Sequence, residues 1–355
     1  MKREIVFDGQ VYAQRMTGQY RYADEILMEL DKIIKKHEYK LIVPEYVEMP
    51  HGFNNIDVIK YGNVKGILWT QTSLYRYLRK HNAISVGFCN ITPILRPGIT
   101  ALLDIGYKVL TNQYKNIYGR LSALWHRLNY SIVANSGKPI ITISQFCKEQ
   151  IAEVYNVPNN RITVIGCGWQ HIERIETDSR IFSKLPKLKK NEYFFALGSL
   201  EERKNFKWIL EVARRNPEET FVIAGGSVAN NKNKLDFGEL PNVIYAGFVS
   251  DGEMKALMQE CKAFLFPSTF EGFGIPPLEA MRMGAKVISS DSACMPEIYE
   301  HSAVYVNPED YDVNLRELLA EPVEPAEKCL DKFSWKKSAE QLHELLIRYS
   351  ENRQF

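Results

Sequence analysis

Short apolar runs alternate with amphipathic stretches along most of the chain, and this alternation restricts the possible fold more than any other feature. An apolar run of roughly four to eight residues between turn signals is typical of a strand buried on both faces. Strands that alternate with helices form parallel sheets covered by helices, so the pattern predicts an α/β fold. At 355 residues the chain exceeds the size at which one core usually keeps growing. We therefore expect two doubly wound domains that face a cleft.

The same patterns give the expected positions of the elements. In the first half, apolar runs predict strands at Glu4–Phe7, Leu41–Val43, Gly66–Trp69, Ser85–Phe88, Ile99–Leu103 and Pro139–Ile143. Helical spacing predicts helices at Tyr20–Lys36, Leu74–His81, Tyr114–Asn135 and Gln145–Tyr155. In the second half, strands are expected at Tyr193–Leu197, Thr220–Ala224, Val243–Tyr245, Ala263–Phe266 and Lys286–Ser289. The predicted parts are a first domain at 1–168, a polar linker at 169–191, a second domain at 192–334 and a terminal helix at 335–355.

Composition argues against several classes of protein. No apolar run approaches the ~20 residues of a membrane-spanning helix, and the chain starts with an apparent strand rather than a signal-peptide core. The six cysteines are scattered without metal-ligand spacing. We therefore expect a cytoplasmic protein with reduced thiols and no metal site.

Charge is distributed unevenly along the chain. Residues 1–175 contain 22 Lys and Arg against 14 Asp and Glu, and the twelve basic residues from His51 to Lys148 face only Asp57 and Asp104. A basic first half suits an anionic membrane surface or a pyrophosphate-bearing acceptor, or it is a solvated basic face. No RNA-binding or helix-turn-helix signature accompanies the charge, so we do not expect nucleic acid as a partner.

The segment Ser268–Met281 carries most of the functional information. It follows the predicted strand Ala263–Phe266 and contains two glutamates eight positions apart, Glu271 and Glu279. Proline is favoured at the start of a helix, so a helix should begin near Pro277, with Glu279 in its first turn and Glu271 on the preceding loop. Free amides at a helix start favour phosphate, and an acid just inside the helix can accept hydrogen bonds from a ribose. The segment indicates a site for a nucleotide-activated sugar; a glycine- and proline-rich surface loop is the alternative.

The string Glu271–Met281, E-G-F-G-I-P-P-L-E-A-M, resembles the donor-site motif of the family 4 retaining glycosyltransferases, which have the two-domain GT-B fold. The resemblance covers nearly the whole chain and is densest over residues 193–306. It implies that Glu271 positions the sugar hydroxyls and stabilises oxocarbenium charge, and that Glu279 holds the ribose. It also implies that the terminal helix at 335–355 packs back on the first domain.

Basic residues follow the predicted strand Tyr193–Leu197, where Gly198 opens a loop that leads to Arg203 and Lys204. Two cations at the carboxyl end of a strand can hold a diphosphate, Arg as a fork and Lys as a point charge; a solvated loop is the alternative. The string resembles the family's R-K-N diphosphate motif, although Ser199 replaces an arginine that some members carry. By this resemblance Arg203 and Lys204 stabilise negative charge on the leaving diphosphate.

Other residues resemble the family's contacts to the donor. Gly18, at a predicted helix start, resembles a first-domain glycine that touches the diphosphate. Gly225-Gly226 and Gly247–Ser250 resemble places where backbone meets the base and phosphates, although an ordinary tight turn also explains the glycine pair. The residues that the resemblance assigns to donor binding are Gly18, Gly198, Val249, Gly272, Phe273, Gly274, Ile275 and Glu279.

Polar residues at two predicted strand ends form the expected acceptor side. Asn90 follows one strand and Asp104 follows another. Many family members have His-Asp at the second place, with the histidine beside the sugar and acceptor; here Leu103 replaces it. The resemblance implies that Asp104 positions or partly deprotonates the acceptor hydroxyl and that Asn90 contacts acceptor or donor hydroxyls. An N-cap or turn role is the alternative for Asp104. The isolated His126 and His171 are expected to be packing or surface residues.

These features together predict a metal-independent retaining hexosyltransferase without a cofactor. The resemblance is to mannosyl- and rhamnosyltransferases of bacterial surface-polysaccharide synthesis, with a GDP-, UDP- or dTDP-linked sugar as donor and a glycan as acceptor. Asp310 and Asp312 spell a D-x-D string that binds metal in other glycosyltransferases, but helix capping explains it better here. The loss of the histidine at Leu103 motivates one alternative, a GT-B accessory or binding protein without transfer. A sugar-nucleotide epimerase is the other.

The helix predicted at Tyr114–Asn135 has one apolar face with basic residues nearby. The face and its flanking residues are Leu121, Leu124, Trp125 and Leu128, with Lys115, Arg120 and Arg127. This face either lies on a membrane interface or packs on the sheet. The basic charge of this region favours a membrane-borne acceptor, namely a polyprenyl-diphosphate-linked sugar at the inner face of the plasma membrane.

Overall fold

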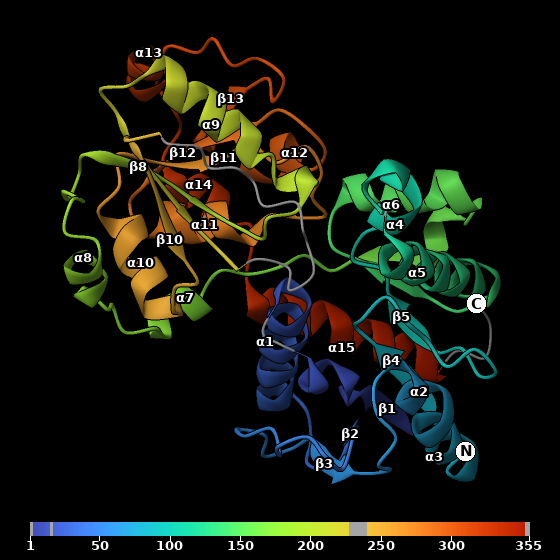
Figure 1. Ribbon diagram of the computed structural model, residues 1–355. Helices are drawn as coiled ribbons and strands as arrows, with labels where there is room; N and C mark the ends of the chain where they lie inside the picture. The colour runs from blue at the N-terminus through green and yellow to red at the C-terminus, as the bar shows by residue number, and fades with distance from the viewer. Residues whose placement is uncertain (1–2, 15–16, 115, 227–239, 352–355) are drawn as a thin grey trace. The chain divides into compact units, whose positions relative to one another are not determined.

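The protein has two compact units, each built on its own parallel sheet. The computed structural model describes residues 3–14, 17–114, 116–226 and 240–351 (Figure 1). The first unit comprises Met1–Gly168 and Ser334–Phe355, and the second comprises Trp169–Phe333. The segment 169–191, predicted as a linker, thus belongs to the second unit.

The sheet of the first unit has seven strands in the order β3-β2-β1-β4-β5-β6-β7. All neighbours pair in parallel. The strands are β1 (Ile5–Asp8), β2 (Lys40–Val43), β3 (Asp57–Lys60), β4 (Ile84–Gly87), β5 (Ile99–Ala101), β6 (Ile140–Thr142) and β7 (Ile162–Val164). β3 and β7 were not predicted: both are short edge strands, and β3 begins and ends with a charged residue.

Helices and single helical turns connect these strands. They are η1 (Gly9–Ala13), α1 (Gly18–Ile33), α2 (Ile67–Trp69), η2 (Thr70–Leu74), α3 (Tyr75–Lys80), α4 (Gly106–Val109), η3 (Thr111–Gln113), α5 (Ile117–Asn135), α6 (Gln145–Tyr155), η4 (Asn159–Arg161) and α15 (Trp335–Glu351). α6 has the predicted bounds, because the Ser144 hydroxyl accepts a hydrogen bond from the backbone N–H of Cys147 and caps its first turn.

One predicted strand is wrong. Residues 66–69 do not form a strand; Gly66 has a φ of 61° and precedes the helical turn α2, which continues into η2. Ile67 and Leu68 are exposed and only Trp69 of this run is buried, packed with Leu74 and Leu78, so the run lacks the continuous burial of a central strand. A short apolar run cannot by itself distinguish a buried strand from a helical turn.

Helix α5 exposes its apolar stripe instead of packing it on the sheet. Leu121 is 60% exposed, Leu124 64% and Leu128 47%, whereas Trp125 is half-buried. The helix packs through a different face that includes Ala123, Tyr130, Val133 and Ala134. The helix begins at Ile117 rather than Tyr114, and Lys115 lies outside the described residues. None of the helices in the described ranges is long and apolar enough to cross a membrane.

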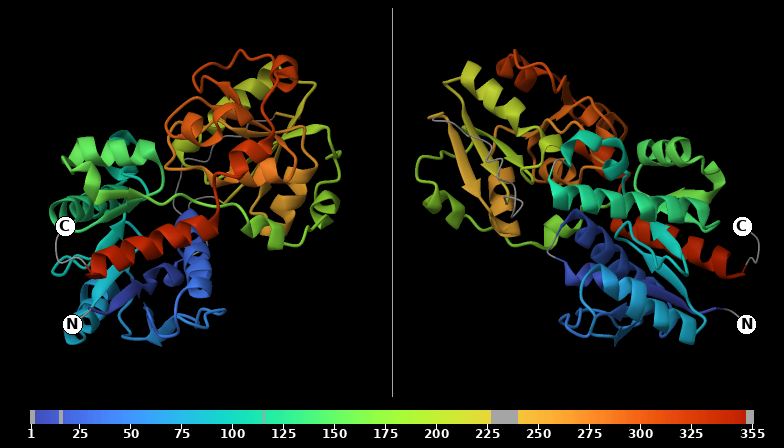
Figure 2. Two further views of the ribbon diagram at one scale, coloured as in Figure 1. Left: turned by 180° about the vertical axis from the view of Figure 1, so that it is seen from behind. Right: turned by 45° about the vertical axis from the view of Figure 1, so that its right-hand side comes forward.

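The terminal helix α15 packs against helix α1. This is the contact with the first unit that the sequence resemblance implies. The two helices lie side by side in Figures 1 and 2, where α15 is red and α1 blue. The rings of Tyr22 and Trp335 meet edge to face at 6.2 Å. The Ser338 hydroxyl donates to the Gly166 carbonyl at 2.7 Å. Residues 352–355 of the predicted helix lie outside the described residues.

The sheet of the second unit has six parallel strands in the order β10-β9-β8-β11-β12-β13. They are β8 (Tyr193–Leu197), β9 (Thr220–Ala224), β10 (Val243–Gly247), β11 (Ala263–Phe266), β12 (Lys286–Ser290) and β13 (Val304–Val306). β8, β9 and β11 have the predicted bounds, because continuous apolar strands of this kind are buried on both faces of a parallel sheet. The first strand of this unit occupies the centre of the sheet, as in other doubly wound folds.

The second unit also contains helices before and between the strands. They are α7 (His171–Arg174), α8 (Arg180–Lys184), η5 (Glu202–Lys204), α9 (Phe206–Arg215), α10 (Asp251–Gln259), α11 (Ile275–Arg282), α12 (Met295–Tyr299), η6 (Glu300–Ser302), α13 (Leu315–Ala320) and α14 (Ala326–Leu330). Segment 169–191 is held in this unit because the buried Lys255 ammonium on α10 donates to the carbonyls of Ile172 and Ile175.

Candidate active site

The strand order of the second unit brings its two functional loops together. β8 and β11 are neighbours at the point where the order of the sheet reverses, and ligands of doubly wound folds bind outside the carboxyl ends of such strands. Arg203 and Lys204 follow β8, and Glu271 follows β11. The Thr269 backbone N–H donates to the Arg203 carbonyl at 2.8 Å, which joins the two loops directly.

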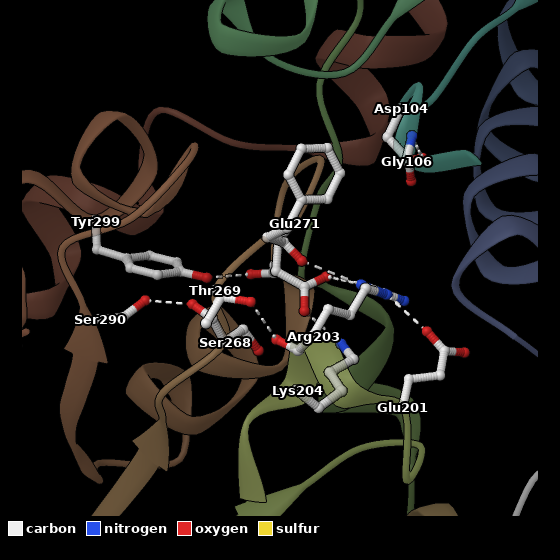
Figure 3. A network of polar contacts seen from close by, with 12 residues as sticks. Asp104, Gly106, Glu201, Arg203, Lys204, Ser268, Thr269, Glu271, Ser290 and Tyr299 are labelled. Carbon is white, nitrogen blue, oxygen red and sulfur yellow. Dashed lines mark hydrogen bonds and ion pairs between the residues drawn. The ribbon is translucent and has the colours of Figure 1, made fainter. Parts of the chain in front are cut away.

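The three predicted charged residues form one ion-pair network, which Figure 3 shows. Arg203 Nη1 lies 2.8 Å from Glu271 Oε2, and Lys204 Nζ lies 2.6 Å from Glu271 Oε1. Glu201 also accepts from Arg203 Nε, at 2.6 Å. Burial acts to raise the pKa of Glu271, but the charges of Lys204 and Arg203 outweigh it and lower this pKa below its usual value. The Glu271 carboxylate is therefore paired with both of the cations that the sequence resemblance assigns to the diphosphate.

The loop after Glu271 has a fixed and crowded backbone. Gly274 has a φ of 86°, and a Cβ there would lie 2.1 Å from the Tyr299 hydroxyl oxygen. That hydroxyl donates to the Gly274 carbonyl at 2.8 Å, so only glycine fits this turn. The Phe273 side chain is buried and meets Phe333 edge to face at 5.1 Å, which leaves backbone as its means of touching a ligand.

Helix α11 begins at Ile275, two residues before the predicted start at Pro277. Both prolines fit because they occupy the second and third positions, where no intrahelical donor is needed. Glu279 consequently lies in the second turn rather than the first.

Glu279 has a partner that sequence reasoning missed. His171 Nε2 lies 2.5 Å from Glu279 Oε1, and both side chains are almost completely buried. His171 was expected to be an isolated packing or surface residue, because nothing local in the sequence links residues that are 108 positions apart. The other isolated histidine, His126, is a packing residue as expected, stacked on Tyr107 at 4.2 Å.

Glycines mark the carboxyl ends of three adjacent strands in this unit. A Cβ on Gly225 would lie 1.7 Å from the Gly198 carbonyl oxygen, and Gly225 has a φ of 146°. The Gly225 backbone N–H donates to the Gly247 carbonyl at 2.8 Å. Val249 is buried beyond the end of β10, before α10. Glycines thus lie at the ends of β8, β9 and β10, where the absence of a side chain suits close approach by a ligand.

In the first unit, the predicted acceptor residues make local structural contacts. Asn90 is buried, and its Oδ1 accepts from the Leu103 backbone N–H at 2.8 Å. Asp104 Oδ1 accepts from the Gly106 backbone N–H at 2.7 Å, which is the turn role considered as its alternative. Gly18 begins α1 after the capping residue Thr17.

Asp8, at the end of β1, is a further buried acid that sequence reasoning did not single out. Its Oδ1 accepts from the Gln10 backbone N–H at 2.9 Å and its Oδ2 from the Thr70 hydroxyl at 3.3 Å. Burial raises the pKa of Asp8 to about 6, against the smaller opposing effect of these hydrogen bonds. Its position at the end of the first predicted strand was the available signal.

Nothing in the described ranges groups three or more His, Cys, Asp or Glu side chains as metal ligands. Asp310 Oδ1 accepts from the Asp312 backbone N–H at 2.9 Å, so this pair forms a turn. It does not cap the next helix, because Asn314 caps α13.

Comparison with known proteins identifies a family domain in the second unit. Residues 177–332 match the family model described as glycosyl transferases group 1. The chain is 29% identical over 194 residues to the O-antigen chain mannosyltransferase B of Escherichia coli, covering 50% of each chain. It is also 29% identical over 178 residues to the O-antigen chain mannosyltransferase RfbU of Salmonella typhimurium, covering 49% of this chain and 48% of that one. The matches thus span about half the length of these curated relatives.

Solved structures show the same fold over nearly the whole chain. A sucrose-phosphate synthase from Thermosynechococcus elongatus superposes with a TM-score of 0.73 at 14% identity, covering 98% of this chain and 99% of that one. The glycosyltransferase WaaG of lipopolysaccharide biosynthesis superposes with a TM-score of 0.66 at 17% identity, covering 98% of each chain. These findings confirm the predicted GT-B fold. Residues 177–332 thus match a glycosyl transferases group 1 domain, and the chain as a whole has the fold of the GT-B glycosyltransferases.

Proposed function

We propose that the protein is a retaining, metal-independent hexosyltransferase that moves mannose or a related hexose from a nucleoside-diphosphate sugar to a glycan hydroxyl. The observation that carries this proposal is the network of Arg203, Lys204 and Glu271 at the reversal point of the second sheet. Mannose is proposed because the two curated relatives compared above are mannosyltransferases of O-antigen chains.

In the proposed reaction, the donor diphosphate takes the place of the Glu271 carboxylate beside the two cations. Arg203 and Lys204 then stabilise the negative charge that grows on the leaving diphosphate, a role that metal ions have in other transferases. Glu271, released from the cations, accepts hydrogen bonds from the sugar hydroxyls and stabilises positive charge at the anomeric carbon. The leaving diphosphate takes the acceptor proton, so no cofactor is required.

A donor and acceptor screen tests this proposal. GDP-, UDP- and dTDP-linked sugars are incubated with and without lipid-linked and soluble glycans, and the anomeric proton of the product is followed by NMR. Transfer with the donor's configuration supports the proposal. Donor conversion to another sugar nucleotide without acceptor would indicate the epimerase alternative, and nucleotide binding without any turnover would indicate the accessory protein.

We also propose that the acceptor is membrane-borne and that helix α5 lies on the inner face of the membrane. The support is the exposed stripe of Leu121, Leu124 and Leu128, which Arg120 and Arg127 flank within the basic region from His51 to Lys148. An amphipathic helix with basic flanks binds anionic lipid interfaces through apolar insertion and charge attraction.

Vesicle flotation tests the membrane contact. We expect binding to phosphatidylglycerol vesicles but not to phosphatidylcholine vesicles, and a steep loss of binding as salt shortens the Debye length below about 10 Å. Replacing Leu121 and Leu124 with serine should abolish flotation, whereas Val323→Ser, at an exposed valine of the second unit, should not. Absence of binding at low salt, together with efficient transfer to a soluble glycan, would contradict this proposal.

A further inference from the structure

The buried pair of His171 and Glu279 is a contact between two segments of the second unit that are far apart in the sequence. The imidazole Nε2–H donates to Glu279 Oε1 at 2.5 Å. The His171 and Glu279 side chains are 2% and 4% exposed. His171 lies in the segment that precedes β8. Glu279 lies on α11, the helix that follows the Glu271 loop in the sequence.

Hydrogen bonds hold the chain just before and just after His171. Trp169 Nε1 donates to the Leu330 carbonyl at 2.9 Å, and Gln170 Nε2 donates to the Phe333 carbonyl at 3.0 Å. After the histidine, the Lys255 ammonium donates to the Ile172 carbonyl at 2.9 Å. These bonds fix the backbone on both sides of residue 171, so the ring has little freedom to leave the carboxylate.

The hydrogen bond leaves Glu279 able to bind a second group. A carboxylate offers about four lone-pair sites, and the ring N–H occupies one of them on Oε1. A carboxylate whose orientation is already fixed loses less conformational entropy when it binds a diol than one that must first be ordered. The vicinal hydroxyls of a ribose form a diol that this carboxylate could bind.

Stability of the fold alone is a weak explanation for this pair. A buried polar pair pays a desolvation penalty that apolar residues of similar volume avoid, so apolar replacement is often neutral or stabilising. We infer that His171 is a positioning residue that fixes the Glu279 carboxylate for the ribose hydroxyls of the donor nucleotide. The inference rests on the proposed function, because it takes a nucleoside-diphosphate sugar as the donor.

Calorimetry with GDP, UDP and their 2′,3′-dideoxy counterparts tests the inference on the full chain. For the preferred base, the unmodified protein should bind the ribose form more tightly than the dideoxy form. His171→Phe keeps a ring but removes the donor, so this preference should fall by about tenfold, the effect of losing one hydrogen bond to a charged group. Affinity for the dideoxy form should stay unchanged. Glu279→Ala should reduce the preference equally, and the double variant should lose no more.

Conservative replacements separate positioning from folding. His171→Gln places an amide N–H near the position of Nε2 and should restore most of the ribose preference, whereas the shorter His171→Asn should not. This comparison also decides the matter if His171→Phe fails to fold. Equal weakening of ribose and dideoxy binding in the variants, or an unchanged preference, would overturn the inference while leaving the proposed function standing. Failure of the unmodified protein to bind any nucleoside diphosphate would overturn the proposed function, and the inference with it.

Discussion

Replacing Glu271 with alanine removes the carboxylate that Arg203 and Lys204 share, and we expect two opposite effects. Transfer should fall by orders of magnitude, because the carboxylate no longer binds the sugar. Affinity for the bare nucleoside diphosphate should rise, because the variant no longer carries an internal anion that competes for the two cations. A simple sugar-binding role for Glu271 would instead leave the affinity for the nucleotide unchanged.

The size of the gain follows from the geometry. Two unit charges about 4 Å apart interact by roughly 4 kcal/mol at an effective dielectric constant of about 20. The Arg203 side chain is 24% exposed and the Lys204 side chain 14%, so solvent screens part of this attraction. After this discount we expect diphosphate binding to strengthen by about 1–3 kcal/mol, or roughly 5- to 150-fold.

Calorimetric titration of GDP and UDP into both proteins measures this gain. Guanosine and uridine serve as ligands without phosphate, and their affinity should not change. Glu201→Ala is the matched control variant: Glu201 also pairs with Arg203, at 2.6 Å, but its side chain is 41% exposed. Removing it should change the affinity by less than about 1 kcal/mol. Weaker diphosphate binding in Glu271→Ala than in the unmodified protein would refute the competition argument.

Three further outcomes are expected. Asp8→Asn should stabilise the protein by about 3 kcal/mol at pH 7. Folding raises the pKa of the Asp8 carboxyl from 3.8 to about 6, so the unmodified protein loses stability as the pH rises through that interval. Urea unfolding should show that the gain from Asp8→Asn shrinks toward pH 4, and equal gains at pH 4 and pH 7 would contradict this prediction. Glu279→Ala should weaken binding of the nucleoside diphosphate by about 1–3 kcal/mol in calorimetry, and unchanged affinity would exclude its ribose role. Transfer should survive excess EDTA and the replacement of Asp310 and Asp312 by alanine; a loss on chelation that Mn²⁺ or Mg²⁺ reverses would show a metal requirement.

Local sequence patterns were sufficient for the central strands and for the position of the donor-site string. β8, β9 and β11 have the predicted bounds because each is an apolar run, with Thr220 at the start of β9 the one polar residue, and burial on both faces of a parallel sheet favours such a run. α6 has the predicted bounds because its cap is the residue immediately before it, Ser144. The string that begins at Glu271 was placed correctly as a loop that leads from a strand into a helix, although the helix begins two residues earlier than predicted.

Contacts between distant segments required the tertiary structure. Glu271 meets Arg203 and Lys204 across 68 and 67 positions because β8 and β11 are neighbours in the sheet. Glu279 meets His171 across 108 positions because the segment that carries His171 belongs to the same compact unit as α11. Residue periodicity reports which face of an element is buried, but it does not report which element covers that face. That choice depends on the packing of whole helices and strands against one another, so the sequence alone determined the separate parts of the site and the fold decided their partners.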